Sequence, residues 1–276
     1  MKVVTSFLVL AFTLLFASFS TAQNNLSLYI SSVGSAAITQ SDGKISLLVL
    51  AGGNEQGEAT AGNCVVGANL TKIEGGFSGA LSPISTGINS YNDEQAQGKK
   101  VSIEQRTGSI VISDVDYIGI CSLDSGLINI YKEVQRDDKG YRSVYAEMIN
   151  LAHEDSLFLY KKGMKSEAMA ELAPYAGYYQ SNWLADKKLA GMVIPALNDY
   201  AYFLQENDQA ADSISILNDI VGAAPKRAVA WLNLADSNWA VGKQEEAKAQ
   251  YKIYGELMTK SNQKSKVPKR AIERIN

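Results

Sequence analysis

The amino-acid sequence predicts an α+β protein of two domains, an N-terminal all-β sandwich or barrel followed by a C-terminal helical array. Two observations predict this division. Between residues 23 and 135, short apolar or alternating runs are separated by turns rich in Gly, Asn and Asp, which is typical of a small antiparallel sheet. Between residues 143 and 258, apolar residues recur every three or four positions, which is the period of one helix face. The charged segment 136–142 is the expected linker.

Residues 1–22 are expected to be a secretory signal peptide and not part of the fold. Lys2 precedes an apolar stretch, and Ser20-Thr21-Ala22 places small residues at the two positions that signal peptidase reads. The alternative, an uncleaved membrane anchor, is disfavoured because the stretch is shorter than the ~20 residues of a spanning helix. We therefore expect an exported protein, periplasmic or secreted, with no transmembrane segment after cleavage.

The β half contains seven or eight strand-like runs separated by turn residues, as a small sandwich or barrel requires. These runs cover residues 26–30, 45–50, 64–70, 77–81, 101–103, 110–112, 117–121 and 127–134.

Cys64 and Cys121 are the only cysteines, and both lie in the β half. In an exported protein such a pair predicts one disulfide, here between the third expected strand and the penultimate one. A zinc site is disfavoured, since two cysteines and one distant histidine do not complete a tetrahedral shell. A nucleophilic thiol is disfavoured as well, because the single histidine lies in the other half.

The helical half contains a pattern that recurs after 34 residues. Its last occurrence is formed by Trp231, Leu234, Ala235, Gly242, Ala247 and Tyr251. The corresponding positions 34 residues earlier hold Leu197, Tyr200, Ala201, Asp208, Ser213 and Leu217. A third, more divergent unit has Gly163, Ala168 and Leu172 at the same spacing, with Ala152 and Asp155 in its first helix. Gly163 and Gly242 are 79 residues apart, so about eleven extra residues precede the second unit.

This pattern resembles the tetratricopeptide (TPR) repeat, in which an aromatic, a small residue and a glycine mark two packed helices. The N-terminal half resembles no family that we can identify. The resemblance implies three stacked helix pairs and a concave surface for a partner, lined by the first helix of each pair. It places the following residues on that surface: His153, Asn198, Tyr202, Gln205, Leu232, Asp236 and Trp239.

The charge distribution argues against nucleic acid as the partner. Residues 23–135 carry 6 basic and 11 acidic residues, and residues 136–257 carry 13 basic and 17 acidic residues. Binding to nucleic acid requires a basic surface that neutralises phosphates. The C-terminus differs, with 6 basic residues and 1 acidic residue after position 257. We expect residues 259–276 to form a basic, flexible tail.

No group of residues predicts an active site. His153 stands beside Glu154 and Asp155 on a predicted helix, where adjacent side chains point in different directions and form no preassembled triad. The sequence contains no P-loop, no dinucleotide-binding glycine motif and no zinc-protease motif. We therefore expect no catalytic residue, no cofactor and no metal.

The function that these observations favour is an exported protein–protein interaction adaptor. Its partner is another protein or a peptide. One alternative is a periplasmic immunity or inhibitor protein directed against a toxin or a cell-wall hydrolase. A second alternative, of another class, is a hydrolase that acts outside the cytoplasm.

Overall fold

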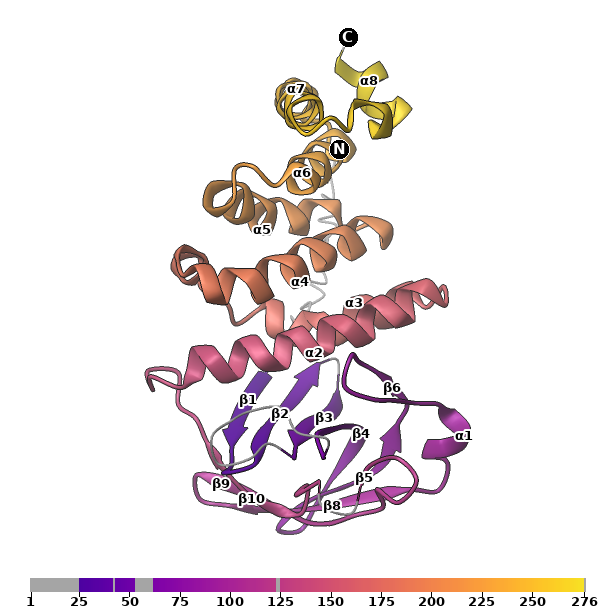
Figure 1. Ribbon diagram of the computed structural model, residues 1–276, viewed down its shortest axis with the longest axis vertical. Helices are drawn as coiled ribbons and strands as arrows, with labels where there is room; N and C mark the ends of the chain where they lie inside the picture. The colour runs from indigo at the N-terminus through magenta and orange to yellow at the C-terminus, as the bar shows by residue number, and fades with distance from the viewer. Residues whose placement is uncertain (1–24, 42, 53–61, 123–124, 276) are drawn as a thin grey trace, which may run out of the picture.

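The computed structural model describes residues 25–41, 43–52, 62–122 and 125–275. The expected signal peptide lies outside the described residues. Figure 1 shows a β-barrel at one end of an elongated molecule and a stack of helices extending from it. The all-β half and the TPR-like helical array predicted from the sequence are thus both present. Among the described residues, no helix combines the length and apolarity needed to cross a membrane.

Eight antiparallel strands form the closed barrel, in the order β1-β10-β9-β8-β5-β4-β3-β2. The strands are β1 Asn25–Ile30, β2 Gly34–Ser41, β3 Lys44–Ala51, β4 Cys64–Ile73, β5 Gly76–Ser82, β8 Lys100–Arg106, β9 Ser109–Val115 and β10 Asn129–Glu133. The chain winds up and down around the barrel, and the pairing of β1 with β10 closes it. Between β5 and β8 the chain forms a small hairpin and one helical turn: β6 Ile84–Ser85, β7 Ser90–Tyr91 and α1 Asp93–Ala96.

Both faces of the sheet are buried on β1 to β4. One set of paired residues, such as Ala36, Val49 and Val66, fills the barrel. The other set, such as Ala37 and Leu48, is buried on the outside, where helices α2 and α3 contact β1 and β2. Residues on this part of the sheet therefore lack the alternation of a half-exposed strand.

Two details of the expected strands were wrong. Strand β2 was not predicted, because its small residues Ala36 and Ala37 do not produce an alternation of apolar and polar residues. The run 117–121 was expected to be a strand, but it forms a turn that contains only an isolated bridge between Ile118 and Cys121. This turn is held by the disulfide and not by a ladder of backbone hydrogen bonds.

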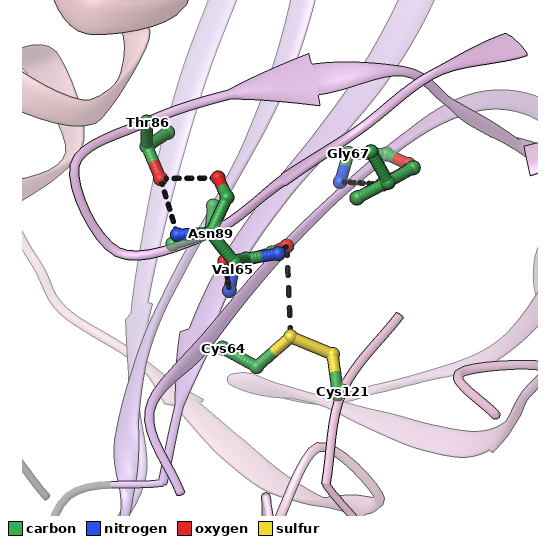
Figure 2. The surroundings of a disulfide bond; sticks show 7 residues. Cys64, Val65, Gly67, Thr86, Asn89 and Cys121 are labelled. Atoms are coloured by element: carbon green, nitrogen blue, oxygen red, sulfur yellow. Dashed lines mark hydrogen bonds between the residues drawn. A yellow bond between two sulfur atoms is a disulfide. The ribbon is translucent and has the colours of Figure 1, made fainter. Parts of the chain in front are cut away.

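A disulfide joins Cys64 at the start of β4 to Cys121, with 5.7 Å between the two Cα atoms (Figure 2). The neighbouring residue, Val65, is fixed by Asn89 from the β6–β7 hairpin. The Asn89 Oδ1 accepts a hydrogen bond from the Val65 amide at 2.7 Å, and its Nδ2 donates to the Val65 carbonyl at 3.0 Å. A covalent bond thus holds the start of β4 on one side. On the other side, the Asn89 side chain forms two hydrogen bonds with the Val65 backbone, as a neighbouring strand would.

The helical half consists of three antiparallel pairs followed by a short last helix. The helices are α2 Tyr141–Lys161, α3 Lys165–Ala176, α4 Lys187–Glu206, α5 Ala210–Ala223, α6 Ala228–Ala240, α7 Gln244–Lys260 and α8 Lys269–Ile275. The residues that turn the chain within the three pairs are Gly163, Asp208 and Gly242, with φ of 83°, 61° and 83°. All three are left-handed, a conformation that favours glycine. The shared backbone geometry supports the repeat alignment, in which Asp208 takes the place of a glycine.

The barrel and the first five helices of the array, α2 to α6, share one continuous hydrophobic core. Helix α2 is the element that joins them, since it contacts β1, β2 and β6 as well as α3 and α4. The segment predicted as a linker is short: β10 ends at Glu133, and α2 begins at Tyr141, whose side chain is buried. The Arg136 Nη2 also donates to the Tyr178 carbonyl at 3.0 Å, so this segment is held against the array.

The extra residues before the second unit form a 3-10 helix, η1 Ser181–Ala185. Trp183 of this helix is buried and makes edge contacts with the rings of Tyr141 and Tyr145 on α2. The insertion therefore fills the space beside the first helix of the array.

The expectation of a flexible tail at residues 259–276 was wrong. Helix α7 continues to Lys260, and residues 264–266 and 269–275 form η2 and α8. Ala271 is fully buried against the end of the array, and two arginines of α8 bind an aspartate on α6. The basic residues are thus used in packing the chain terminus, an arrangement that charge counting alone does not distinguish from a solvated tail.

We predict that loss of the disulfide lowers the free energy of unfolding. The bond closes a loop with a sequence separation of 57 residues, and removal of a native disulfide from a small domain costs about 2–5 kcal/mol. Urea unfolding of the wild type and of the Cys64→Ser/Cys121→Ser variant measures the difference. Thiol titration of the denatured, unreduced protein serves as a control and should find no free thiol. Equal unfolding midpoints for the two proteins would contradict the prediction.

Candidate functional site

The candidate site is the face formed by the first helix of each pair, α2, α4 and α6. We call it the first-helix face and define it by Tyr160, Tyr202, Leu232, Asp236 and Trp239. Each of these residues is partly exposed, at positions spread over the three helices. The TPR resemblance pointed to this face, and the structure shows what each predicted residue does there.

Between α2 and α4, the first-helix face consists of two tyrosines and an ion pair. The hydroxyls of Tyr160 and Tyr202 are 3.0 Å apart, and their rings meet edge to face. Glu206 accepts hydrogen bonds from Tyr160 at 3.4 Å and from Lys165 at 2.5 Å. The hydrogen bond from Lys165 lowers the pKa of Glu206, whereas burial and the Tyr160 hydrogen bond raise the pKa of Tyr202. This part of the face offers aromatic surface with fixed hydroxyl groups.

His153 and Asn198 were predicted to face a partner, and the structure corrects this prediction. Both side chains are buried, His153 at 8% exposure and Asn198 at 1%. The His153 Nε2 lies 2.8 Å from the Asp199 Oδ2, and Asn198 bonds to Asp199 and to Asn233 on α6. In the first two units, the position one residue after the counterpart of Trp231 therefore lies in the seam between neighbouring first helices, where polar side chains are satisfied by each other.

Gln205 also belongs to this seam. Its Nε2 donates to the Asn233 carbonyl at 2.9 Å and to the Ser237 Oγ at 2.6 Å, and Ser213 of α5 meets the same hydroxyl at 2.6 Å. Because its amide is engaged between α4 and α6, Gln205 fixes the distance between these helices. Its partly exposed side chain borders the first-helix face without offering its amide nitrogen.

Asp236 and Trp239 lie at the C-terminal end of the face, where α8 covers them. Arg270 donates to both Asp236 carboxylate oxygens, with the shortest distance 2.7 Å. Arg274 donates to Asp236 at 3.0 Å and to the Tyr251 hydroxyl at 2.6 Å, and its guanidinium lies 4.8 Å from the Trp239 ring centroid. The Tyr251 hydroxyl in turn donates to Asp236 at 2.6 Å. We call this arrangement of Asp236, Trp239, Tyr251, Arg270 and Arg274 the arginine clasp.

Asp236 and Trp239 were predicted to be partner-binding residues, but the two arginines that contact them were not predicted from the sequence. The spacing of Arg270 and Arg274 contained a usable signal, because residues four apart project from the same side of a helix. Pro268 directly before Lys269 was a second signal, since proline is favoured at the start of a helix.

A second feature that was not predicted from the sequence is a cavity of about 230 Å³ with mixed polar and apolar lining, between the barrel and the first helix pair. It is lined by side chains from α2 and α3, including Asp155, Glu171 and Tyr175, and by strand residues that include Thr39, Ser46, Asn69 and Ser82. Asp155 accepts a hydrogen bond from the Ser85 amide of β6 at 2.7 Å. Beside it, Glu154 accepts from the Gly87 amide at 2.8 Å, so two carboxylates of α2 hold the β6–β7 hairpin.

Burial changes the protonation of the two carboxyl groups in this cavity. It raises the pKa of Asp155 to about 6, against the lowering effects of the Ser85 amide and of Lys162. It raises the pKa of Glu171 to about 7, and the nearby charge of Asp155 contributes to this shift. Both groups therefore change charge between pH 5 and pH 8 in the folded protein.

Among the described residues, neither the first-helix face nor the cavity beside the barrel contains a recognisable catalytic group. The ring of His153 is paired with a carboxylate, and the Ser156 hydroxyl beside it donates to the His153 carbonyl and not to the ring. The described residues contain no cluster of three or more His, Cys, Asp or Glu side chains arranged to hold a metal ion.

Comparison with known proteins yields similarity to solved structures only. No protein-family model matches the chain, and no curated protein matches it. The first TPR of Spaghetti (RPAP3), bound to the HSP90 peptide SRMEEVD, is 18% identical with a TM-score of 0.35 and covers 46% of this chain and 95% of its own.

Two further solved structures are similar over about the same share of the chain. The C-terminal TPR-containing domain of a Plasmodium falciparum putative FK506-binding protein is 14% identical, with a TM-score of 0.39; the match covers 49% of this chain and 92% of that one. MamA from Desulfovibrio magneticus RS-1 is 15% identical, with a TM-score of 0.33, over 49% of this chain and 77% of that one. The C-terminal half is a TPR-like helical array, as its own repeat geometry shows.

We predict that Asp155 and Glu171 lower the free energy of unfolding as the pH rises from about 4 to 7. The folded-state pKa values of Asp155 and Glu171 lie above their ordinary values of 3.8 and 4.5. The folded state therefore binds protons more tightly than the unfolded state. Each group contributes a slope of up to about 1.4 kcal/mol per pH unit across the interval between its two pKa values. Urea unfolding at a series of pH values measures this slope.

The variant Glu171→Gln should reduce this pH dependence, because glutamine does not ionise. Glu246→Gln on the exposed surface of α7 is the matched control and should leave the slope as in the wild type. The same slope in all three proteins would contradict the assignment.

Proposed function

We propose that this protein is an exported adaptor that binds another protein through the first-helix face of its helical array. One observation carries this proposal. Tyr160, Tyr202 and Leu232 are only partly buried and lie on three neighbouring first helices, and Trp239, also partly buried, lies next to them under α8. Large aromatic side chains that remain accessible on a rigid surface are typical of the residues that dominate the energy of protein interfaces.

The polar groups on the same face support a role in recognition. The hydroxyls of Tyr160 and Tyr202 and the carboxylate of Asp236 are held by neighbouring side chains, so their directions are fixed before a partner arrives. A preorganised surface loses little conformational entropy on binding, which favours affinity and selectivity.

Export is supported by two independent properties of the chain. The N-terminal residues have the charge, apolar stretch and small residues of a cleaved signal. The bond between Cys64 and Cys121 is of a kind that persists in oxidising compartments and is rare in the cytosol.

A photo-crosslinking amino acid at position 202 tests the proposal in the cells that make the protein. We expect a crosslinked partner protein when the probe replaces Tyr202. The matched control is a probe at Asn218, an exposed position on α5, a second helix. Crosslinking to the same protein from Asn218 but not from Tyr202 would contradict the use of the first-helix face.

Once the partner is identified, we predict that the Tyr202→Ala/Trp239→Ala variant binds it more weakly by about 2 kcal/mol or more, in the range of aromatic hot spots. Isothermal titration calorimetry measures the affinity, and far-UV circular dichroism confirms that the variant is folded. An unchanged dissociation constant in a folded variant would remove these two rings from the interface.

A further inference from the structure

Helix α8 packs on α7 and the end of the array over a small apolar area, in which Val267 and Ile275 accompany Ala271. Its single buried residue is Ala271, whereas Ile272 is 54% exposed. In the segment that connects it to α7, residues 261–266 are exposed, whereas Val267 and Pro268 are partly buried. Two arginines supply the polar attachment, and their side chains are 48% and 28% exposed. Isolated ion pairs at this exposure contribute about 0–1 kcal/mol each and are screened by salt, whereas a bidentate pair within a network contributes more. The attachment of α8 therefore depends on a small apolar contact and on a salt-sensitive network of ion pairs.

The surface beneath α8 is specific for arginine. The Asp236 carboxylate is only 15% exposed and accepts from Arg270 through two nitrogens, as a planar guanidinium allows and an ammonium does not. The second guanidinium lies against Trp239 and bonds to the Tyr251 hydroxyl. One carboxylate, one indole and one phenol are therefore matched to two guanidinium groups that stand one helical turn apart.

Charge complementarity extends beyond this contact. The part of the chain from residue 136 to 257 carries 13 basic and 17 acidic residues, while the segment after it carries 6 basic residues and 1 acidic residue. A basic segment of another protein would be attracted to the array for the same reason that α8 is.

We propose that Asp236, Trp239 and Tyr251 form a receptor site for a helix that presents two arginines four residues apart. In the isolated protein α8 is the built-in occupant, and a partner with this chemistry replaces it. The inference rests on the proposed function only for the existence of a natural partner, because the site itself is visible in its occupied form.

Replacement of α8 would also uncover the rest of the face. The side chains of Asp236 and Trp239 become accessible on the same helix as Leu232. We expect a partner helix longer than the seven residues of α8 to contact more of α6 than α8 does, which gives it an advantage over the intramolecular occupant.

A labelled peptide with the sequence of residues 264–276 tests the site in the full-length protein by fluorescence anisotropy. The variant Arg270→Ala/Arg274→Ala weakens the internal occupant and should bind the peptide at least about tenfold more tightly than the wild type, a change of about 1.4 kcal/mol. The matched control, Lys264→Ala/Lys266→Ala, removes the same charge from residues outside the clasp and should bind like the wild type. Thermal unfolding shows that each variant is folded.

Two further variants, each combined with Arg270→Ala/Arg274→Ala, should lose this tight binding. Asp236→Asn removes the carboxylate, and Trp239→Leu removes the aromatic surface. A peptide in which both arginines are alanine should not bind, and raising the salt to roughly 0.5 M should weaken the complex. Absence of peptide binding to Arg270→Ala/Arg274→Ala, or binding that survives Asp236→Asn and Trp239→Leu, would overturn the inference.

The outcomes separate this inference from the proposed function. Peptide binding without a crosslinked partner at position 202 supports the arginine site and contradicts the proposed function. A crosslinked partner without peptide binding supports the proposed function and contradicts the arginine site.

Discussion

The burial of helix α2 on two sides is the constraint on which the rest of the structure depends. One side of α2 packs against the barrel strands β1 and β2, and the other contacts α3 and α4. Buried residues therefore occur on all sides of α2, and Tyr145, Met148 and Ala152 are completely inaccessible to solvent. This position explains why the first unit departs from the repeat pattern. Asp155 stands where the last unit has Leu234, because its neighbour is the amide of Ser85 in the β6–β7 hairpin and not an apolar helix face.

A stack of helix pairs leaves an apolar surface open at each end, which must be covered for the protein to remain soluble. In this molecule the two ends are covered in different ways. The barrel covers the N-terminal end through a shared hydrophobic core. Helix α8 covers the C-terminal end through Ala271 and the arginine clasp. The barrel contributes a large buried apolar area, whereas the attachment of α8 depends on ion pairs of partly exposed arginines. The barrel and α8 thus lie at opposite ends of the array (Figure 1).

The features that local chemistry determines could be predicted from the sequence, and those that depend on a distant neighbour could not. The last repeat unit carries its own signature, and Tyr251 is fully buried as that signature implies. Trp231 is only partly buried, because its indole nitrogen donates to the Pro225 carbonyl at the edge of the helix pair. The repeat pattern predicts an exposed position for His153, but its ring is paired with Asp199 of α4 and is buried in the seam between the two helices. Residues 269–275 are held by Asp236, which lies 34 residues before Arg270; the spacing of the two arginines indicates a shared helix side but does not identify this partner.

Calorimetric unfolding of the whole protein tests the central claim, that α2 joins the barrel and the array into one cooperative unit. Tryptophan fluorescence adds a selective probe, since all three tryptophans lie in the helical half. The account predicts a single transition near neutral pH, with equal calorimetric and van't Hoff enthalpies and a fluorescence change that coincides with it. Two separate transitions, or a fluorescence change that is complete while the barrel is still folded, would contradict the account.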